Sequence, residues 1–493
     1  MKGTPLLNSL IVIYKAFYNK IKNQNSVLWQ VSSVAGATVI AQALNVLVLP
    51  VLSRIYSTAD FGVMSVYSSI ITVLATISGL NYHLAIPLPK QNRYAHALVI
   101  LSFVLQIIVV ALVTIFLSVA GGFILEKLSM ESLMPYKLLL PVGLFFIGIY
   151  NIASQWAIRE SLFSTLGKTK ITQSFCGAVI KIVMGIAGSR PLGLLIGTIA
   201  GQGSGIITLL RHICKNNGIP KWENSDIKHV LLRYRNFPIY STLFSILNTI
   251  GINMPQLFLS SYFNTQITGL YSMANALLHI PSVFIGQALG QIFLQRASVA
   301  AHSGNLKQLA FNAYIILLKV GFFPTIFISI FAPFIFSFVL GAKWTASAEY
   351  AVLLAPWLAI AFVFSPLSML YAVQNRQEIG LLTEVIYFIL RLSSMWLGAR
   401  ANNPYLAVGL FSLSGAVLLS CRLIDILKSL GHPIRIVILS ALKIIVSSIV
   451  LVSFPFLLLR IDANLMLITI SCVIVCFVYV GDIYYTLKKS NIL

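Results

Sequence analysis

The chain has 493 residues, of which 58% are hydrophobic and 9% charged, and 34 Lys and Arg against 12 Asp and Glu give a formal net charge of +22. Soluble domains carry about a quarter charged residues because their surface faces water, so this composition excludes an ordinary soluble protein. A basic excess on a soluble chain would favour nucleic acid. Here the charges separate long apolar runs, as is typical of membrane proteins. We therefore expect a polytopic membrane protein that binds no nucleic acid.

Apolar segments long enough to cross a bilayer recur along the whole chain. A membrane-spanning helix needs about 20 mostly apolar residues. From the N-terminus onward, the pattern predicts an all-α protein with about 14 spans, at residues 28–52, 61–80, 97–119, 138–156, 171–187, 192–211, 239–260, 268–290, 311–340, 348–372, 379–397, 404–427, 437–459 and 464–487. The segment 311–340 is long for one span, and we expect a bend at Pro324 or Pro333.

The distribution of Lys and Arg over the loops predicts the orientation. With the N-terminus in the cytoplasm, the inner loops hold about three times as many basic residues as the outer loops. An even number of spans then places both termini in the cytoplasm. Residues 1–27 lack a small-residue cleavage site. Leu6, Leu10 and Tyr14 recur there at helical spacing, which predicts an amphipathic helix on the inner leaflet, with a basic tail as the alternative.

One sequence pattern occurs twice. Leu-Ser, Thr, Gly and Ser stand at positions 52–53, 58, 62 and 65, and return with one constant offset at 259–260, 265, 269 and 272. Each copy leaves a helix through Leu-Ser, makes a short polar turn and enters the next helix. The repeat predicts two pseudo-symmetric six-helix bundles. We expect them at residues 28–213 and 238–427, with a cytoplasmic linker at 214–237 and two additional transmembrane helices in 428–493.

Five segments carry a resemblance to a known family. They read LPVLSRIYSTADFG at 49–62, LAIPLPK at 84–90, QWAIRE at 155–160, GLYSMA at 269–274 and IGQALGQ at 285–291. In their order and spacing the chain resembles the bacterial oligosaccharide flippase family, part of the superfamily that also holds the multidrug and toxin extrusion transporters. Where this family often has an Arg-aromatic-Glu triplet, this chain has Asn81-Tyr82-His83.

The resemblance implies two bundles around a central cavity that opens alternately to each side of a bacterial cytoplasmic (inner) membrane. It implies translocation of an undecaprenyl-pyrophosphate-linked oligosaccharide, such as an O-antigen repeat unit for lipopolysaccharide, from the cytoplasmic to the periplasmic leaflet. The implied partners are that lipid-linked oligosaccharide, the membrane, and polysaccharide polymerase and chain-length proteins. No cofactor is expected, and coupling to a proton or sodium gradient is a hypothesis that accompanies the resemblance.

Charged residues inside the spans are the first candidates for the site. Such charges are costly in a membrane and usually face a cavity. Lys181, Lys319 and Arg391 are therefore expected to line the cavity and attract the pyrophosphate, with Arg as a bidentate donor and Lys as a point charge. For Lys181, snorkelling to the membrane surface is the alternative.

Polar residues inside the spans complete the candidate site. Asn45, Asn248 and Gln256 can bind sugar hydroxyls or, equally, neighbouring helices. Glu384 precedes Arg391 by seven residues, which places both on one helix face. Glu384 is either a titratable site for the coupling ion or a charge that a nearby basic residue compensates.

Two other classes of function are weighed against the flippase. A small-molecule or multidrug cation antiporter would be expected to favour acidic groups in its cavity, whereas the charges within these spans are mostly basic. A membrane glycan polymerase or transferase would be expected to carry a large outer loop, and every predicted outer loop is short. The sequence contains no metal-ligand cluster and no nucleophile motif, so no catalytic residue and no metal site is predicted.

Overall fold

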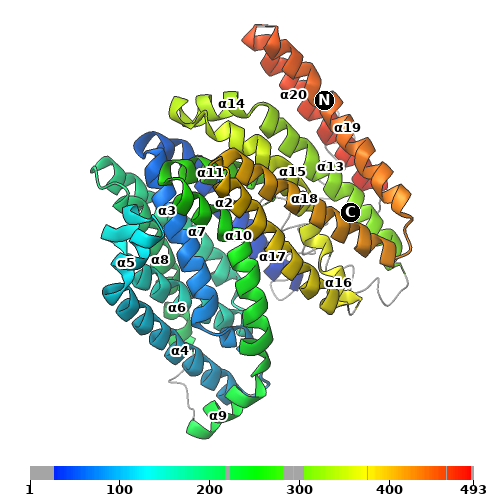
Figure 1. The fold of residues 1–493 in the computed structure, drawn as a ribbon. Helices are drawn as coiled ribbons and strands as arrows, with labels where there is room; N and C mark the ends of the chain where they lie inside the picture. Colours follow the sequence, from blue (N-terminus) through cyan, green and yellow to red (C-terminus); the bar gives the residue numbers. More distant parts are fainter. Residues whose placement is uncertain are drawn as a thin grey trace, which may run out of the picture.

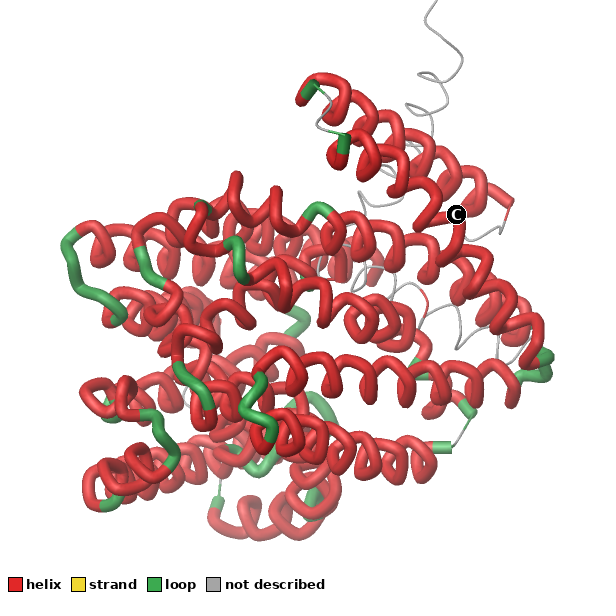
Figure 2. The backbone as a smooth tube through the Cα atoms, turned by 45° about the horizontal axis from the view of Figure 1, so that its top comes forward, coloured by secondary structure: helices red, strands yellow, loops and turns green. Residues whose placement is uncertain are grey.

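The computed structural model describes residues 27–216, 223–282, 293, 305–374, 376–461 and 464–489. Throughout these residues the regular elements are helices and none is a strand (Figure 2). Eleven of the described helices are long and apolar enough to cross a membrane. The all-α polytopic fold that the composition predicts is therefore confirmed. The amphipathic helix expected in residues 1–27 falls almost wholly outside the described residues.

The helices of the first half follow the expected spans closely. They are α2 (Val27–Ile55), α3 (Thr58–Ser78), α4 (Asn92–Val119), α5 (Gly121–Lys127), α6 (Leu139–Arg159), α7 (Phe163–Ile186) and α8 (Leu192–Asn216), with the 3₁₀ turns η1 (Tyr82–Ala85) and η2 (Glu131–Tyr136). A short helix, α9 (Asn224–Arg233), lies in the stretch expected to be a linker.

The second half continues in the same way. It contains the π-helical turn η3 (Phe237–Ser241), α10 (Thr242–Tyr262), α11 (Thr265–Leu278), α13 (Leu306–Ile330), α14 (Ala332–Ile335), the π-helical turn η5 (Phe336–Leu340), the 3₁₀ turn η6 (Ala342–Trp344), α15 (Ser347–Leu367), α16 (Leu370–Val373), α17 (Gln377–Arg400), α18 (Pro404–Ser429), α19 (Ile434–Arg460) and α20 (Leu465–Lys489). Each expected span overlaps one of these helices.

Two boundaries differ from the sequence-based expectation in ways that matter for function. Helix α7 begins at Phe163, eight residues before the expected start at 171, so Lys170 belongs to the helix and not to a loop. The long segment 311–340 is divided: α13 contains Pro324 and ends at Ile330, and α14 starts just before Pro333. A proline fits the first turn of a helix, where its missing N–H is not needed, so Pro333 stands at the start of α14 and the expected span is interrupted there.

The helices form two groups that meet along α3, α10 and α11. Figure 1 shows α3–α8 on one side and α13–α18 on the other, with α2, α10 and α11 in the middle of the view. Helix α3 packs against both α10 and α11, and Thr76 and Asn81 near the end of α3 bond Thr249 (3.3 Å) and Ser245 (3.2 Å) of α10. These contacts join the two halves of the molecule. The limits of the two bundles as domains stay a prediction.

The last two helices form a hairpin at the side of the second group. Figure 1 shows α19 and α20 (orange and red) beside α13. The ring of Tyr479 on α20 stacks on Phe323 of α13 with 3.9 Å between centroids, and Lys319 Nζ lies 2.6 Å from an Asp482 carboxylate oxygen. Most of the large apolar side chains on the hairpin are exposed, as expected for a surface that faces lipid.

Candidate transport cavity

A polar cavity of about 370 Å³ opens among four helices of the first group. Helices α2, α3, α7 and α8 supply its walls. The polar lining residues are Thr38, Gln42, Asn45, Lys170, Gln173, Ser174, Lys181, Thr198 and Gln202. Two of the residues predicted for the site, Lys181 and Asn45, therefore share one cavity.

The polar residues of α7 form a stripe along this cavity. Lys170 and Lys181 are eleven residues apart, which is about three helical turns, so both side chains project from the same face. Gln173 and Ser174 lie between them on that face, and Gln173 donates to Gln202 of α8 at 3.4 Å. The stripe thus has a cation at each end, which can bind phosphate oxygens, and an amide and a hydroxyl group between them, which can bind sugar hydroxyls.

Glycines bring the two polar helices together. A Cβ on Gly177 of α7 would meet the carbonyl oxygen of Gly197 at 3.0 Å, and a Cβ on Gly201 of α8 would meet the carbonyl oxygen of Gln173 at 3.0 Å. A Cβ on Gly197 would lie 2.4 Å from Cγ of Lys181. Close backbone approach through small residues is the usual way that helices associate in membranes. The glycines therefore pack the helices and fix where Lys181 enters the cavity.

A tryptophan from the second half of the chain packs behind the lining residues at one end of the cavity. Leu52 and Phe61 line this end of the cavity, and the indole of Trp344 packs edge-on against Phe61 with 5.1 Å between ring centroids. Trp344 has no exposed surface, and its Nε1 donates to the carbonyl oxygen of Ser53 at 3.0 Å. We call this part of the molecule the Trp344 end.

Hydrogen bonds beside Trp344 hold the same contact. Lys343 Nζ donates to the carbonyl oxygen of Tyr56 at 2.7 Å, a group left without an intrahelical partner at the end of α2. Ser53 Oγ donates to the carbonyl oxygen of Leu340 at 3.0 Å. Burial and the nearby Arg190 guanidinium lower the pKa of Lys343, while Asp60 opposes that shift. The Trp344 end is therefore a packed and hydrogen-bonded closure between the two halves.

Lys181 lies close to this closure. The hydroxyl of Tyr56 donates to the backbone carbonyl oxygen of Lys181 at 2.7 Å. Lys170 lies nearer the opposite end, called the α9 end, and its Nζ stands 5.0 Å from the centroid of the Tyr150 ring. Among the residues that the structure describes, neither lysine has a carboxylate within ion-pair distance. Both cations are therefore available to an anionic ligand.

Arg391 lies in the second group of helices, where aromatic side chains surround its guanidinium group. Its guanidinium carbon stands 3.6 Å from the centroid of the Tyr387 ring and 5.0 Å from that of Phe411, and it donates to the Tyr387 hydroxyl. A Cβ on Gly251 of α10 would lie 3.2 Å from Arg391 Nη1. Cation–π contacts of this kind stabilise a desolvated guanidinium by about 2 kcal/mol. Arg391 is thus packed in an aromatic enclosure and does not line the polar cavity.

Glu384 is paired across helices. Its Oε2 accepts from Arg422 Nη1 of α18 at 2.9 Å, and both side chains are buried. Arg422 also lies over the ring of Phe364, 4.5 Å from its centroid. The charge of Glu384 is therefore compensated by a basic residue, which is one of the two alternatives that the sequence leaves open. The partner is Arg422 and not Arg391. A role of Glu384 with a coupling ion stays a prediction.

The remaining predicted residues are separate from the polar cavity. Lys319 faces α20, where it bonds Asp482 and, at 2.9 Å, the hydroxyl of Thr486. Asn248 and Gln256 are on α10, and the buried Oε1 of Gln256 accepts no hydrogen bond from the described residues. The structure therefore brings Lys181 and Asn45 together and leaves the other five predicted residues elsewhere.

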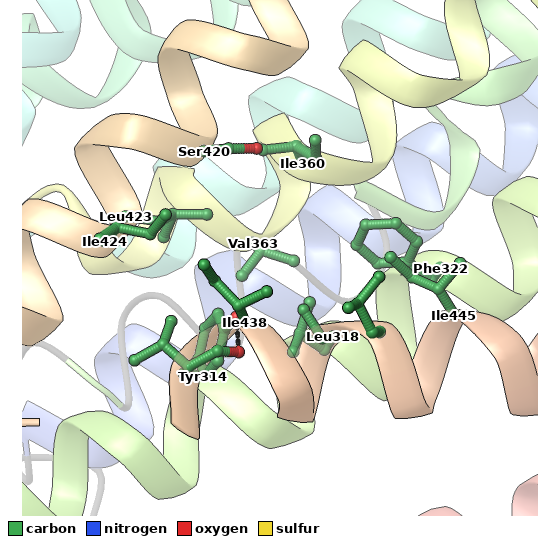
Figure 3. A pocket seen from close by; sticks show the side chains of 13 residues that line it. Tyr314, Leu318, Phe322, Ile360, Val363, Ser420, Leu423, Ile424, Ile438 and Ile445 are labelled. Carbon is green, nitrogen blue, oxygen red and sulfur yellow. Dashed lines mark hydrogen bonds between the residues drawn. The ribbon is translucent and has the colours of Figure 1, made fainter. Parts of the chain in front are cut away.

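A second cavity, of about 210 Å³, lies between α13, α15, α18 and α19 (Figure 3). Its lining is apolar except for Ser420 and Tyr314, whose hydroxyl donates to the carbonyl oxygen of Val437 at 3.2 Å. Figure 3 shows Leu318, Phe322 and Val363 on its walls. No charged side chain lines it, so it is suited to hydrocarbon and not to phosphate.

At the α9 end, the short helix is held against the first group. Arg93, at the start of α4, bonds Asp226 of α9 through Nε at 2.8 Å, and the rings of Tyr94 and His229 stack with 4.7 Å between centroids. The hydrogen bond from Arg93 holds the pKa of Asp226 below its usual value. Helix α9, which connects the two halves in sequence, is thereby fixed to the first group.

Comparison with solved structures identifies the fold. The fold is similar to that of the lipid II flippase MurJ in its inward closed conformation, with a TM-score of 0.74 and 15% identity over 93% of this chain and 99% of that one. It is also similar to the MATE transporter VcmN of Vibrio cholerae (TM-score 0.55, 13% identity, 83% and 97% of the two chains) and to a MOP superfamily transporter from Pyrococcus furiosus (0.54, 13%, 82% and 96%). The chain thus has the MOP fold.

The family follows from a sequence model. Residues 51–349 match the model described as polysaccharide biosynthesis protein, and the chain belongs to this family. No curated sequence matches it. The resemblance drawn from the five motifs is therefore confirmed.

Two functional features were missed from the sequence. The apolar run of this span begins at residue 171, so hydropathy alone leaves Lys170 outside the span, although its eleven-residue spacing from Lys181 indicates a shared face once the helix is extended. Trp344 lies in a short connection and contacts residues almost three hundred positions earlier in the chain. A local pattern carries no signal for such a contact.

Proposed function

We propose that this protein is a non-enzymatic flippase for an undecaprenyl-pyrophosphate-linked oligosaccharide, an O-antigen or related repeat unit. It moves this lipid from the cytoplasmic to the periplasmic leaflet of the bacterial inner membrane by alternating access. The observation that supports the proposal most is the polar cavity of the first group, with unpaired Lys181 and amide groups on one wall. A pyrophosphate needs cations, and a glycan needs amide donors and acceptors.

The family match and the similar solved structures support the same function. The family is one of polysaccharide biosynthesis, and the solved structure described as a lipid II flippase shares the fold over nearly its whole length. In the proposed orientation both termini are cytoplasmic, and the Trp344 end faces the periplasm. The contact of Trp344 with Ser53 then closes the periplasmic side while the cargo is loaded from the cytoplasm. Polysaccharide polymerase and chain-length proteins are the proposed partners that use the flipped lipid.

The energy source is part of the proposal. A proton or sodium gradient would drive the cycle, and Glu384 is the candidate coupling residue. Its bond with Arg422 (2.9 Å) would have to open or exchange during each turnover. Neutralising one partner of a buried pair leaves the other charge uncompensated at a cost of about 3–5 kcal/mol, so protonation of Glu384 would favour a new position or a new partner for Arg422.

The test is deletion of the gene in its native host. We expect lipid-linked oligosaccharide to accumulate on the inner leaflet and polymerised surface glycan to disappear, with recovery on complementation. Unchanged glycan together with a new sensitivity to cationic drugs would contradict the proposal and favour a multidrug antiporter of the same superfamily.

A further inference from the structure

We infer that Lys170 and Lys181 are two successive binding stations for the anionic group of the cargo, joined by a track of amide and hydroxyl groups along α7. This inference rests on the proposed function and deepens it by adding Lys170 and a direction of movement. The cavity itself is the first observation, because both lysines line it.

The distance between the two lysines separates their roles. Eleven residues of α-helix separate the two Cα atoms by about 16 Å, and the Lys170 side chain leans toward the N-terminus of α7, away from Lys181. A pyrophosphate, two phosphates that share one oxygen, is short compared with this separation. One such group therefore occupies one lysine at a time. Since Lys170 lies toward the α9 end and Lys181 beside Tyr56 at the Trp344 end, occupancy of the two in turn carries the charge along the cavity.

The surroundings of each lysine suit a site that binds the anionic group of the cargo and then releases it. Lys170 is half-buried and stands over the ring of Tyr150, whose hydroxyl lies 3.0 Å from the Thr169 hydroxyl. The ring attracts the ammonium and orients it without neutralising it. A carboxylate in that place would compete with the phosphate. In the part of the chain that the structure describes, neither station has such a competitor.

The wall between the stations can hold the cargo in transit. Gln173 and Ser174 project from α7, and Gln202 faces them from α8. Beyond them Gly177 and Gly197 hold α7 and α8 in close contact, so the polar groups of the two helices share one wall of the cavity. Amide and hydroxyl groups replace part of the hydration that an anion loses in a low-dielectric cavity.

The experiment measures binding stoichiometry on the full chain in nanodiscs. Inorganic pyrophosphate is the first probe, since it has no tail and reports the cations alone, and farnesyl pyrophosphate is the second. We expect two pyrophosphates per wild-type chain, one in Lys170→Gln, one in Lys181→Gln and none in the double variant. Lys168→Gln is the matched control, because Lys168 is exposed on the same helix and does not line the cavity, and it should still bind two.

A single pyrophosphate in the wild type, lost in Lys181→Gln and unaffected by Lys170→Gln, would overturn the two-station inference. Equal loss in Lys168→Gln would do the same, because it would show unspecific attraction to surface charge. The pyrophosphate stoichiometry and the glycan export assay test different claims. A chain that exports glycan but binds one pyrophosphate contradicts only the inference, whereas a chain that binds two and whose deletion leaves glycan export intact contradicts only the proposed function.

Discussion

Gly62 and Gly269 occupy equivalent positions of the sequence repeat, and each packs against the first turn of the other repeat's helix. A Cβ on Gly62 of α3 would lie 1.8 Å from the carbonyl oxygen of Thr265 in α11, and a Cβ on Gly269 of α11 would lie 1.8 Å from that of Thr58 in α3. Thr58 and Thr265 are themselves repeat-related. The contact is therefore reciprocal, and it places the axis of the repeat at the start of α3 and α11.

Substitution of either glycine should separate these helices. Gly62→Ala or Gly269→Ala puts a methyl group where a backbone oxygen lies, and such overpacking costs about 1–3 kcal/mol. We expect a lower Tm of the purified protein and reduced glycan export in cells. Gly36→Ala on α2 is the control, because a Cβ there meets nothing within 4 Å. Equal Tm values for Gly62→Ala and Gly36→Ala would show that the contact is not tight in the protein.

Removal of the Trp344 side chain should open the end of the cavity that it closes. Trp344→Ala deletes a fully buried indole and its hydrogen bond to Ser53, a change that costs about 3–5 kcal/mol in a packed site. In a Leu52→Cys variant, the new thiol at this end of the cavity should then react with a membrane-impermeant reagent added to intact cells. Trp344→Phe, which keeps a ring against Phe61, should react more slowly. Equal labelling with and without Trp344 would contradict its role as the closure.

Variants of the Glu384–Arg422 pair can distinguish a purely stabilising ion pair from one that also exchanges the coupling ion. Glu384→Gln leaves Arg422 buried without its counter-charge, which costs about 3–5 kcal/mol. If the pair is only structural, Glu384→Gln combined with Arg422→Gln should regain most of the Tm and of the export. If Glu384 also exchanges the coupling ion, the double variant should regain Tm but not gradient-dependent export. Export by Glu384→Gln that keeps its full dependence on the gradient would remove Glu384 as the coupling residue.

The attachment of α9 should depend on pH. The pKa of Asp226 is lowered by the bond from Arg93, so the folded state favours the ionised carboxylate. This contribution to stability is present above the usual Asp pKa of about 4 and is lost as the pH falls through the lower folded-state value. Asp226→Asn should therefore lower the Tm at pH 7, and its difference from the wild type should shrink toward pH 3. A difference that is constant from pH 7 to pH 3 would contradict the ion pair.

Much of the fold could be predicted because a bilayer demands continuous apolar helices. Each expected span overlaps a helix, and the repeat that contains Gly62 and Gly269 predicted two related bundles, whereas the contact between the two glycines and the facing helices is seen only in the structure. Helix ends were harder to predict where polar residues continue the helix past the apolar run, as Lys168 and Lys170 do in α7. The hydropathy of a segment reports lipid exposure, whereas α7 has a polar face turned to a cavity.

The site was only partly predictable, since charge within a span indicates a buried polar environment but not which one. Lys181 faces the cavity, Arg391 faces aromatic rings, and Lys319 faces Asp482. All three satisfy the same physical requirement, that a cation in a membrane must find polar or π-electron partners. Which partner each one finds depends on contacts between helices distant in sequence.

The most direct test of the central claim is the exposure of lipid-linked oligosaccharide on the periplasmic leaflet. In a strain depleted of the chromosomal copy, spheroplasts that carry the wild type, Lys181→Gln or Lys168→Gln are treated with a glycan-cleaving enzyme that cannot cross the membrane. We expect cleavage with the wild type and with Lys168→Gln. With Lys181→Gln, cleavable lipid should appear at least tenfold more slowly, because one charged hydrogen bond contributes about 1.5–3 kcal/mol. Cleavage that is equally fast in all three strains and in the depleted strain would contradict the proposed flippase function.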